Sequence, residues 1–232
     1  MTVPYETAKA DLLQAALMHV PFDGWSEATF QAAIRDAEIP ASVARAICPR
    51  GAVDLAVAFH KNGDAAMLAR LEEADLSGMK FREKVTAAVR YRLEVIEDKE
   101  AVRRGSTLFA LPMYAPEGAK LVWGTCDAIW KALGDSSTDV NWYTKRATLA
   151  GVYSATVLYW LGDDSPDHMA TWAFLDRRIE DVMRIEEVKA RVRKSPTLSR
   201  LMAGPNWVLS HIKAPGAAPR SNLPGSWTAP RN

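Results

Sequence analysis

The helical spacing of apolar residues along most of the chain constrains the fold more than any other feature. Apolar side chains recur three and four positions apart in runs of helix length, whereas the alternation typical of strands is scarce. Proline and glycine fall between these runs. The pattern predicts an all-α protein with helices at 5–19, 26–37, 41–48, 51–74, 80–103, 116–133, 138–161, 166–192 and 197–213.

The run at 138–161 is the most apolar of these segments. Ser136 and Asp139 form an S-x-x-D capping pattern just before it, with Ser137 and Thr138 as competing caps, so a helix is predicted to begin near Thr138. Two apolar stripes follow on different faces, one headed by Trp142 and one by Tyr143. A helix that is apolar nearly all round is buried by neighbours on several sides, so this segment is expected at the centre of the fold.

Composition and motifs argue against catalysis. The 232 residues are 48% hydrophobic, enough for one large domain with a sizeable core. Cys48 and Cys126 stand far apart with no CxxC or Cys/His clustering, which argues against a disulfide framework and a zinc site. The sequence has no E-x-x-H pair, P-loop, G-x-G-x-x-G or nucleophile motif. We therefore predict no catalytic residue, no metal site, no cofactor and no enzyme activity.

The first three predicted helices are short and separated by tight turns, a helix-turn-helix layout that resembles the start of the TetR regulators. Duplex affinity comes chiefly from Lys and Arg that neutralise phosphates. Residues 1–64 carry five Lys/Arg against eight Asp/Glu, and the candidate recognition helix "ASVARAIC" offers only Arg45, with Arg50 just after it. The layout is therefore interpreted as a packing scaffold that does not bind nucleic acid.

The C-terminal region has the opposite charge. Residues 188–232 contain eight Lys/Arg and no acidic residue. The segment 195–213 carries one apolar stripe beside these cations, which is typical of a helix lying on an anionic membrane surface. Gly204-Pro205 favours a kink or two short helices as an alternative to one continuous helix. A second alternative is a helix that docks permanently on the core or on a second copy of the chain. The candidate membrane residues are Leu198, Arg200, Leu201, Met202, Trp207, Val208, Leu209 and Ile212.

The remaining sequence signals concern location. The first twenty residues lack the basic start of a secretion signal and the Arg-rich pattern of a transit peptide. No stretch approaches the roughly 18 apolar residues of a membrane span. We expect a bacterial, cytoplasmic protein that is peripheral on the cytoplasmic face of the inner membrane, or one on the matrix side if it is mitochondrial. The Pro- and Gly-rich stretch 214–232 is predicted to be a flexible tail.

Two specific segments, "STDVNWYTKR" and "TWAFLDRRI", closely resemble the COQ9 family of ubiquinone biosynthesis proteins. The similarity extends from the helix-turn-helix start to about Lys194. It implies a TetR-like helical bundle that forms a homodimer and holds isoprenoid lipids or quinone precursors in an apolar pocket. It also implies an accessory role beside the di-iron, demethoxyubiquinone-type hydroxylase that acts late on the quinone ring.

By this resemblance Asp139, Trp142 and Tyr143 match the family's hydroxylase-binding surface, and Asn141 and Arg146 beside them complete the candidate docking patch. Trp and Tyr are typical of binding hot spots. The alternative is a capped helix start whose aromatics close the core. Arg146 is then either a charge at the rim of the patch or an ion-pair partner of Asp139.

Aromatic side chains also crowd three consecutive predicted helices, and these are the candidates for a lipid pocket. A pocket between helices can hold a long tail because each buried methylene contributes about 0.8 kcal/mol. The alternative for each residue is ordinary core packing. The candidate lipid-binding residues are Trp123, Trp130, Tyr153, Val157, Trp160 and Trp172.

Together these features predict a lipid-binding accessory protein that presents a quinone intermediate to a hydroxylase. We divide the chain into a helix-turn-helix-like segment (1–50), a helical lipid-binding core (51–194), a membrane-contacting helix (195–213) and a tail (214–232). A lipid-responsive TetR-type regulator is the alternative, and a purely structural adaptor of a biosynthetic complex is a third reading.

Overall fold

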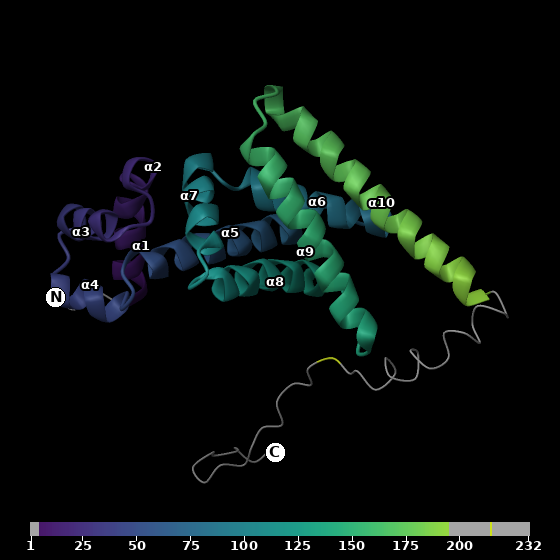
Figure 1. The fold of residues 1–232 in the computed structure, drawn as a ribbon, viewed down its shortest axis with the longest axis horizontal. Helices are drawn as coiled ribbons and strands as arrows, with labels where there is room; N and C mark the ends of the chain where they lie inside the picture. The colour runs from purple at the N-terminus through teal and green to yellow at the C-terminus, as the bar shows by residue number, and fades with distance from the viewer. Residues whose placement is uncertain (1–4, 195–213, 215–232) are drawn as a thin grey trace, which may run out of the picture.

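The computed structural model describes residues 5–194 and Ala214, and this part of the chain is helical with no strand, which confirms the all-α prediction. Figure 1 shows the N-terminal helices grouped at one end and α9 and α10 crossing the other end. The helices are α1 (Tyr5–Leu17), α2 (Val20–Asp23), α3 (Glu27–Asp36), α4 (Ala41–Ile47), α5 (Ala52–Glu73), α6 (Phe81–Glu94), α7 (Lys99–Ala110), α8 (Ala115–Ala132), α9 (Val140–Leu161) and α10 (Met169–Lys194), with a 3-10 turn at Pro166–His168 before α10.

Two hydrophobic cores share the long helix α5. The first core packs α1, α3 and α4 around the start of α5, where Leu55 is buried. The second core packs α6, α8, α9 and α10 around the other half of α5, where Met67 is fully buried. In Figure 1, α5 runs from the N-terminal group into the larger bundle. The helix-turn-helix-like segment is thus joined to the bundle by a continuous helix.

The predicted helix 80–103 is wrong, because the chain breaks into α6 and α7 at residues 95–98. Val95 ends α6, and Asp98 then caps α7 by accepting hydrogen bonds from the backbone N–H groups of Glu100 (2.9 Å) and Ala101 (3.0 Å). Apolar spacing continued across the break and concealed it, whereas the Asp98 cap was a signal for a new helix. The turn at "PFD" also folds into the short helix α2, which the prediction lacked.

The start of α9 differs by two residues from the prediction because Asp139, rather than Ser136, is the N-cap. The Asp139 Oδ1 atom accepts a hydrogen bond from the backbone N–H of Asn141 at 3.0 Å. Ser137 instead hydrogen-bonds to Asp135 within the preceding turn. A carboxylate at the N-cap also meets the positive end of the helix dipole.

Helix α9 is buried on two sides rather than all round. Leu149, Tyr153 and Trp160 are buried against neighbouring helices. By contrast, the Leu158 side chain is 67% exposed, and Gly151 lies in open space. Among the described residues, α8, α10 and α7 make the main contacts with α9, and Leu158 and Gly151 lie on a face that remains exposed.

The predicted helix 197–213, all eight candidate membrane residues and most of the 214–232 tail lie outside the described residues. Ala214 is described, and its backbone N–H donates a hydrogen bond to the carbonyl oxygen of Thr138, 2.9 Å away. No helix in the described ranges is both long and apolar enough to cross a membrane.

Candidate functional site

Three aromatic side chains from α8 and α9 gather at the start of α9. The ring centroids of Trp142 and Tyr143 are 4.7 Å apart in an edge-to-face arrangement. Trp123 of α8 joins them, with centroids 5.8 Å from Trp142 and 6.4 Å from Tyr143. All three side chains are half-buried. We call Trp123, Trp142 and Tyr143 the aromatic cluster; it contains one residue predicted for the lipid pocket, Trp123, and two predicted for docking.

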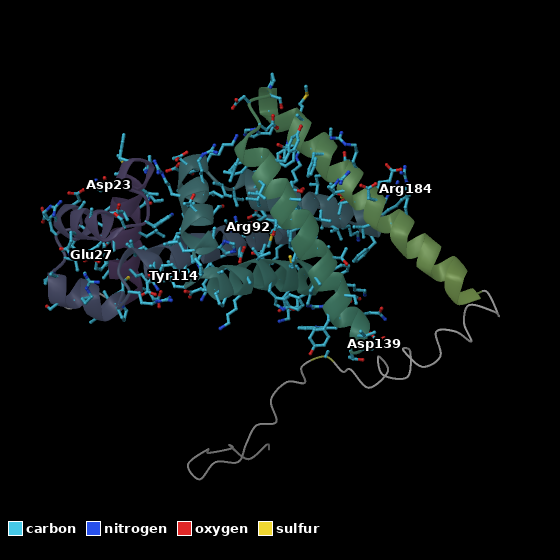
Figure 2. The ribbon with its side chains drawn as sticks, in the orientation of Figure 1. Asp23, Glu27, Arg92, Tyr114, Asp139 and Arg184 are labelled. Carbon is cyan, nitrogen blue, oxygen red and sulfur yellow. The ribbon has the colours of Figure 1, made fainter. Side chains whose placement is uncertain are left out.

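The polar members of the candidate docking patch lie beside this cluster. Asn141 donates a side-chain hydrogen bond to Asp139 Oδ2 at 2.8 Å, and both residues are exposed at the end of α9. Figure 2 shows Asp139 at this free end of the helix. The structure therefore brings Asp139, Asn141, Trp142 and Tyr143 together on one surface.

Arg146 is neither a rim charge nor a partner of Asp139, so both sequence-based readings of it are wrong. Its side chain is 1% exposed and donates to Asp127 Oδ1 (2.7 Å) and Asp135 Oδ2 (3.0 Å). It also donates to the carbonyl oxygen of Trp142 at 3.0 Å, with Cζ 4.1 Å from the Trp142 ring centroid. The turn between α8 and α9 folds back and places Asp135 beside Arg146, a placement that helical spacing alone does not reveal.

The Asp135 carboxylate, together with Arg146, stabilises the turn between α8 and α9. Burial disfavours its charge, yet hydrogen bonds from Lys145, Ser137 and Arg146 outweigh burial and hold the pKa of Asp135 well below its ordinary value. Lys145 Nζ lies 2.8 Å from Asp135 Oδ1. Arg146 and Asp135 therefore fix the backbone from which the aromatic cluster projects.

A cavity of about 290 Å³ lies between α5, α6, α7, α8 and α9. Most of its lining is apolar, and we call it the inner cavity. Two of the six predicted lipid-binding residues, Tyr153 and Val157, line it. The other apolar lining includes Trp25, Phe59, Leu93, Phe109, Leu121 and Leu158.

Polar residues that the sequence analysis did not single out as a site also line the inner cavity, namely His60, Arg92, Ser106 and Ser154. Arg92 Nε donates to Asp64 Oδ1 at 2.6 Å, and the Thr125 hydroxyl donates to the same oxygen at 2.9 Å. His60 Nε2 lies 2.9 Å from the Thr125 oxygen. We call His60, Asp64, Arg92 and Thr125 the polar end of the cavity. Their sequence signal was weak, consisting of His60 and Asp64 one helical turn apart on a helix that carries other charged residues as well.

A second hollow of about 440 Å³ lies between α6, α8, α9 and α10, and we call it the outer groove. Trp130 lines it and stacks on Phe81, with ring centroids 5.4 Å apart. Trp130 Nε1 is buried and has no hydrogen-bond partner among the described residues. Asn141 of the docking patch and Thr148 also line this groove.

The last two lipid-site candidates line neither hollow. Trp160 is 3% exposed, packed in the core beside the His168 ring, with centroids 5.9 Å apart. Trp172 donates from Nε1 to the carbonyl oxygen of Asp167 at 2.8 Å, and the guanidinium of Arg90 lies over its ring. The structure thus separates the six candidates, with two in the inner cavity, Trp130 in the outer groove and Trp123 in the aromatic cluster.

The cations of the helix-turn-helix-like segment are paired with carboxylates. Arg45 is exposed on α4, and its Nη2 atom lies 2.5 Å from Glu27 Oε1. Arg50 pairs with Asp54 at 2.6 Å and with Glu117 of α8 at 2.5 Å. Neither of the two cations near the candidate recognition helix is left free to meet a phosphate. In the described part of the chain, no three His, Cys, Asp or Glu side chains are grouped to hold a metal ion.

Comparison with known proteins identifies a family model and several proteins that this chain resembles. The family model named COQ9 matches residues 115–186, which include α8, the aromatic cluster and α9. The chain is 32% identical over 186 residues to "Ubiquinone biosynthesis protein COQ9, mitochondrial" of Drosophila melanogaster, covering 78% of this chain and 57% of that protein. The protein of the same name from Homo sapiens is 30% identical over 192 residues, covering 79% of this chain and 60% of that protein.

The chain therefore spans less than two thirds of the length of these relatives. Among solved structures, it is similar to a TetR transcriptional regulator from Nitrosomonas europaea, with a TM-score of 0.63 and 16% identity. The match covers 75% of this chain and 97% of the regulator. At that identity the likeness concerns the fold, and it confirms the predicted TetR-like architecture.

Proposed function

The chain carries the COQ9 domain and is a homologue of the COQ9 proteins, and from this premise we propose that it is an accessory protein of ubiquinone biosynthesis. In this proposal it binds an isoprenoid quinone precursor in the inner cavity and presents it to a demethoxyubiquinone-type hydroxylase. The observation that carries the proposal is an apolar cavity with one polar end, which matches an amphiphile with a long tail and an oxygen-bearing ring.

Docking of the hydroxylase is assigned to the aromatic cluster and to Asp139 and Asn141 next to it. The cluster is half-buried, Arg146 packs on the Trp142 ring, and Trp123 and Tyr143 contact that same ring, so Trp142 is already supported before a partner arrives. Preorganised Trp and Tyr side chains bury large areas on binding while they lose little further entropy. This favours docking over the alternative in which the rings only close the core.

We assign membrane contact to segment 195–213 and catalysis to the hydroxylase. The chain would then work at an anionic surface, on the cytoplasmic face of the inner membrane in a bacterium or on the matrix side in a mitochondrion. A homodimer is part of the proposal, because α9 has an uncovered face. In the same scheme, residues 1–50 are a scaffold, 51–194 hold the lipid and 214–232 are a tail.

A reconstituted reaction tests this function. Anionic vesicles carrying the prenylated hydroxylase substrate are mixed with the hydroxylase, with and without the full chain, and the hydroxylated product is measured. The proposal predicts faster hydroxylation with the chain present and no stimulation by Trp142→Ala. Equal rates with and without the wild-type chain would contradict it. Stimulation by a chain that binds no lipid would favour the structural-adaptor reading.

The TetR-like fold supports one competing function, a lipid-responsive transcription regulator. The charge pattern opposes it, since Arg45 and Arg50 are both engaged by carboxylates. Fluorescence anisotropy with the DNA upstream of its own gene, at low salt, separates the two functions. Sequence-specific binding that weakens steeply with salt would favour the regulator.

A further inference from the structure

The polar end of the inner cavity contains more buried polar side chains than the binding of an apolar tail requires. A pocket that held only an isoprenoid chain would be more stable with apolar side chains throughout, because buried polar groups lose hydration. Here Arg92 is 3% exposed and Thr125 is fully buried. In the view of Figure 2, Arg92 lies between α7 and α9. The arrangement therefore points to a polar portion of the ligand at this end.

The polar end carries no net charge. The positive guanidinium of Arg92 is matched by the Asp64 carboxylate at 2.6 Å. Burial, assisted by the nearby charge of Arg92, lowers the pKa of His60 to about 4, so the imidazole is neutral at physiological pH. An anionic ligand head would lose its hydration here without meeting an unpaired cation, which is strongly unfavourable in a buried site.

Two hydrogen-bond donors remain unused beside the charge-balanced pair. The Tyr153 hydroxyl has no hydrogen-bond partner among the described residues, although Tyr153 is 4% exposed and lines the cavity. Burial raises the pKa of Tyr153, so its hydroxyl stays protonated and can donate. Arg92 donates through Nε and Nη2, while its Nη1 donates no hydrogen bond within the described residues.

We propose that Tyr153 and Arg92 recognise an uncharged ring that carries carbonyl or hydroxyl oxygens, and that the inner cavity rejects carboxylate and phosphate heads on tails of the same length. The unused donors match neutral acceptor oxygens, and the balanced charge disfavours an anion. Tyr153 is thus a specificity residue that discriminates by head group. This inference rests on the proposed function, since it takes the inner cavity as the lipid site.

The test compares three ligands that share a decyl tail: a benzoquinone, a carboxylate and a phosphate. Binding to the full chain is measured by titration calorimetry at pH 7. We expect the quinone to bind at least about tenfold tighter than either anion. Tyr153→Phe should weaken quinone binding about fivefold, the size of one lost hydrogen bond, and leave the melting temperature unchanged because the hydroxyl has no protein partner.

Tyr159→Phe is the matched control, since it removes a hydroxyl from the exposed face of the same helix and should leave all three affinities unchanged. The inference is overturned if the anions bind as tightly as the quinone, or if Tyr153→Phe binds the quinone as well as the wild type does. Either result leaves the proposed function standing. Failure of all three ligands to bind the wild-type chain would remove the lipid site and the inference together.

Discussion

The guanidinium of Arg146 packs on the ring of Trp142, with Cζ 4.1 Å from the ring centroid, and donates to the Trp142 carbonyl oxygen at 3.0 Å. One fully buried cation thus supports a partly exposed aromatic surface. Two carboxylates, Asp127 and Asp135, balance its charge. This contact links the stability of the α8–α9 turn to the shape of the candidate docking surface.

Replacing Arg146 should therefore destabilise the whole fold. Arg146→Met leaves Asp127 and Asp135 without their shared partner in a buried site, and we expect a loss of about 3 kcal/mol in the free energy of unfolding. Urea denaturation measures the change. Arg184→Met is the control, because Arg184 pairs with Glu180 on an exposed face of α10 and contributes at most about 0.5 kcal/mol. Similar losses in the two variants would contradict the structural role of Arg146.

Trp142→Ala should weaken hydroxylase binding without unfolding the chain. Removal of a central aromatic anchor typically costs about 2 kcal/mol of binding free energy, or roughly 30-fold in affinity. Surface plasmon resonance with immobilised hydroxylase provides the measurement. Trp172→Ala is the matched control, since Trp172 is also half-buried but lies on α10, outside the aromatic cluster. Equal affinities of wild type and Trp142→Ala would remove the docking assignment.

Two glycine substitutions should change stability in opposite directions. A Cβ at Gly63 would lie 2.6 Å from Arg92 Nη1, so Gly63→Ala must shift the guanidinium, which is held by Asp64 and the His60 carbonyl oxygen. We expect a net loss of about 1–2 kcal/mol in the free energy of unfolding, despite the better helix propensity of Ala. A Cβ at Gly151 meets open space, so Gly151→Ala should gain about 0.5–1 kcal/mol. Thermal unfolding of both variants checks the opposite signs.

His60 should make the fold sensitive to mild acid. Its pKa is about 4 in the folded chain against an ordinary 6.5, so the unfolded chain binds the proton first. Stability from the neutral imidazole is complete above pH 6.5 and is lost as the pH falls towards 4. Between pH 7 and pH 5 this amounts to about 2 kcal/mol. Urea unfolding of the wild type and of His60→Gln at both pH values measures this effect. The free energy of unfolding should change by about 2 kcal/mol less between pH 7 and pH 5 in the variant than in the wild type. Identical changes in the two proteins would contradict the burial of a neutral His60.

Helix α9 shows most clearly which structural features could be predicted from the sequence. Apolar spacing located the helix to within two residues, because one periodic pattern held over its full length. The same pattern could not show that Leu158 stays exposed while Tyr153 is buried, or that both line the inner cavity, since that depends on which helices pack against each face. Burial of Arg146 depended on the fold of a turn, and turns leave little periodic signal.

The polar end of the inner cavity was missed for a related reason. His60 and Arg92 are 32 positions apart and meet only because α5 and α6 pack together. Aromatic residues were predicted to line a lipid pocket, but Trp160 packs beside His168 and Trp172 packs against Arg90. The COQ9 resemblance implied a lipid pocket and aromatic side chains on three helices supplied its candidates, but only tertiary contacts showed which side chains face the open volume.

Native mass spectrometry of freshly purified protein shows whether the inner cavity holds a lipid. The wild type is compared with Val157→Trp, which fills the inner cavity, and with Thr148→Trp, which adds the same bulk at the outer groove. We predict a bound prenylated ring compound in the wild type and in Thr148→Trp, and at least a tenfold loss of that compound in Val157→Trp. A wild-type chain free of lipid, or a lipid retained by Val157→Trp and lost from Thr148→Trp, would contradict this prediction.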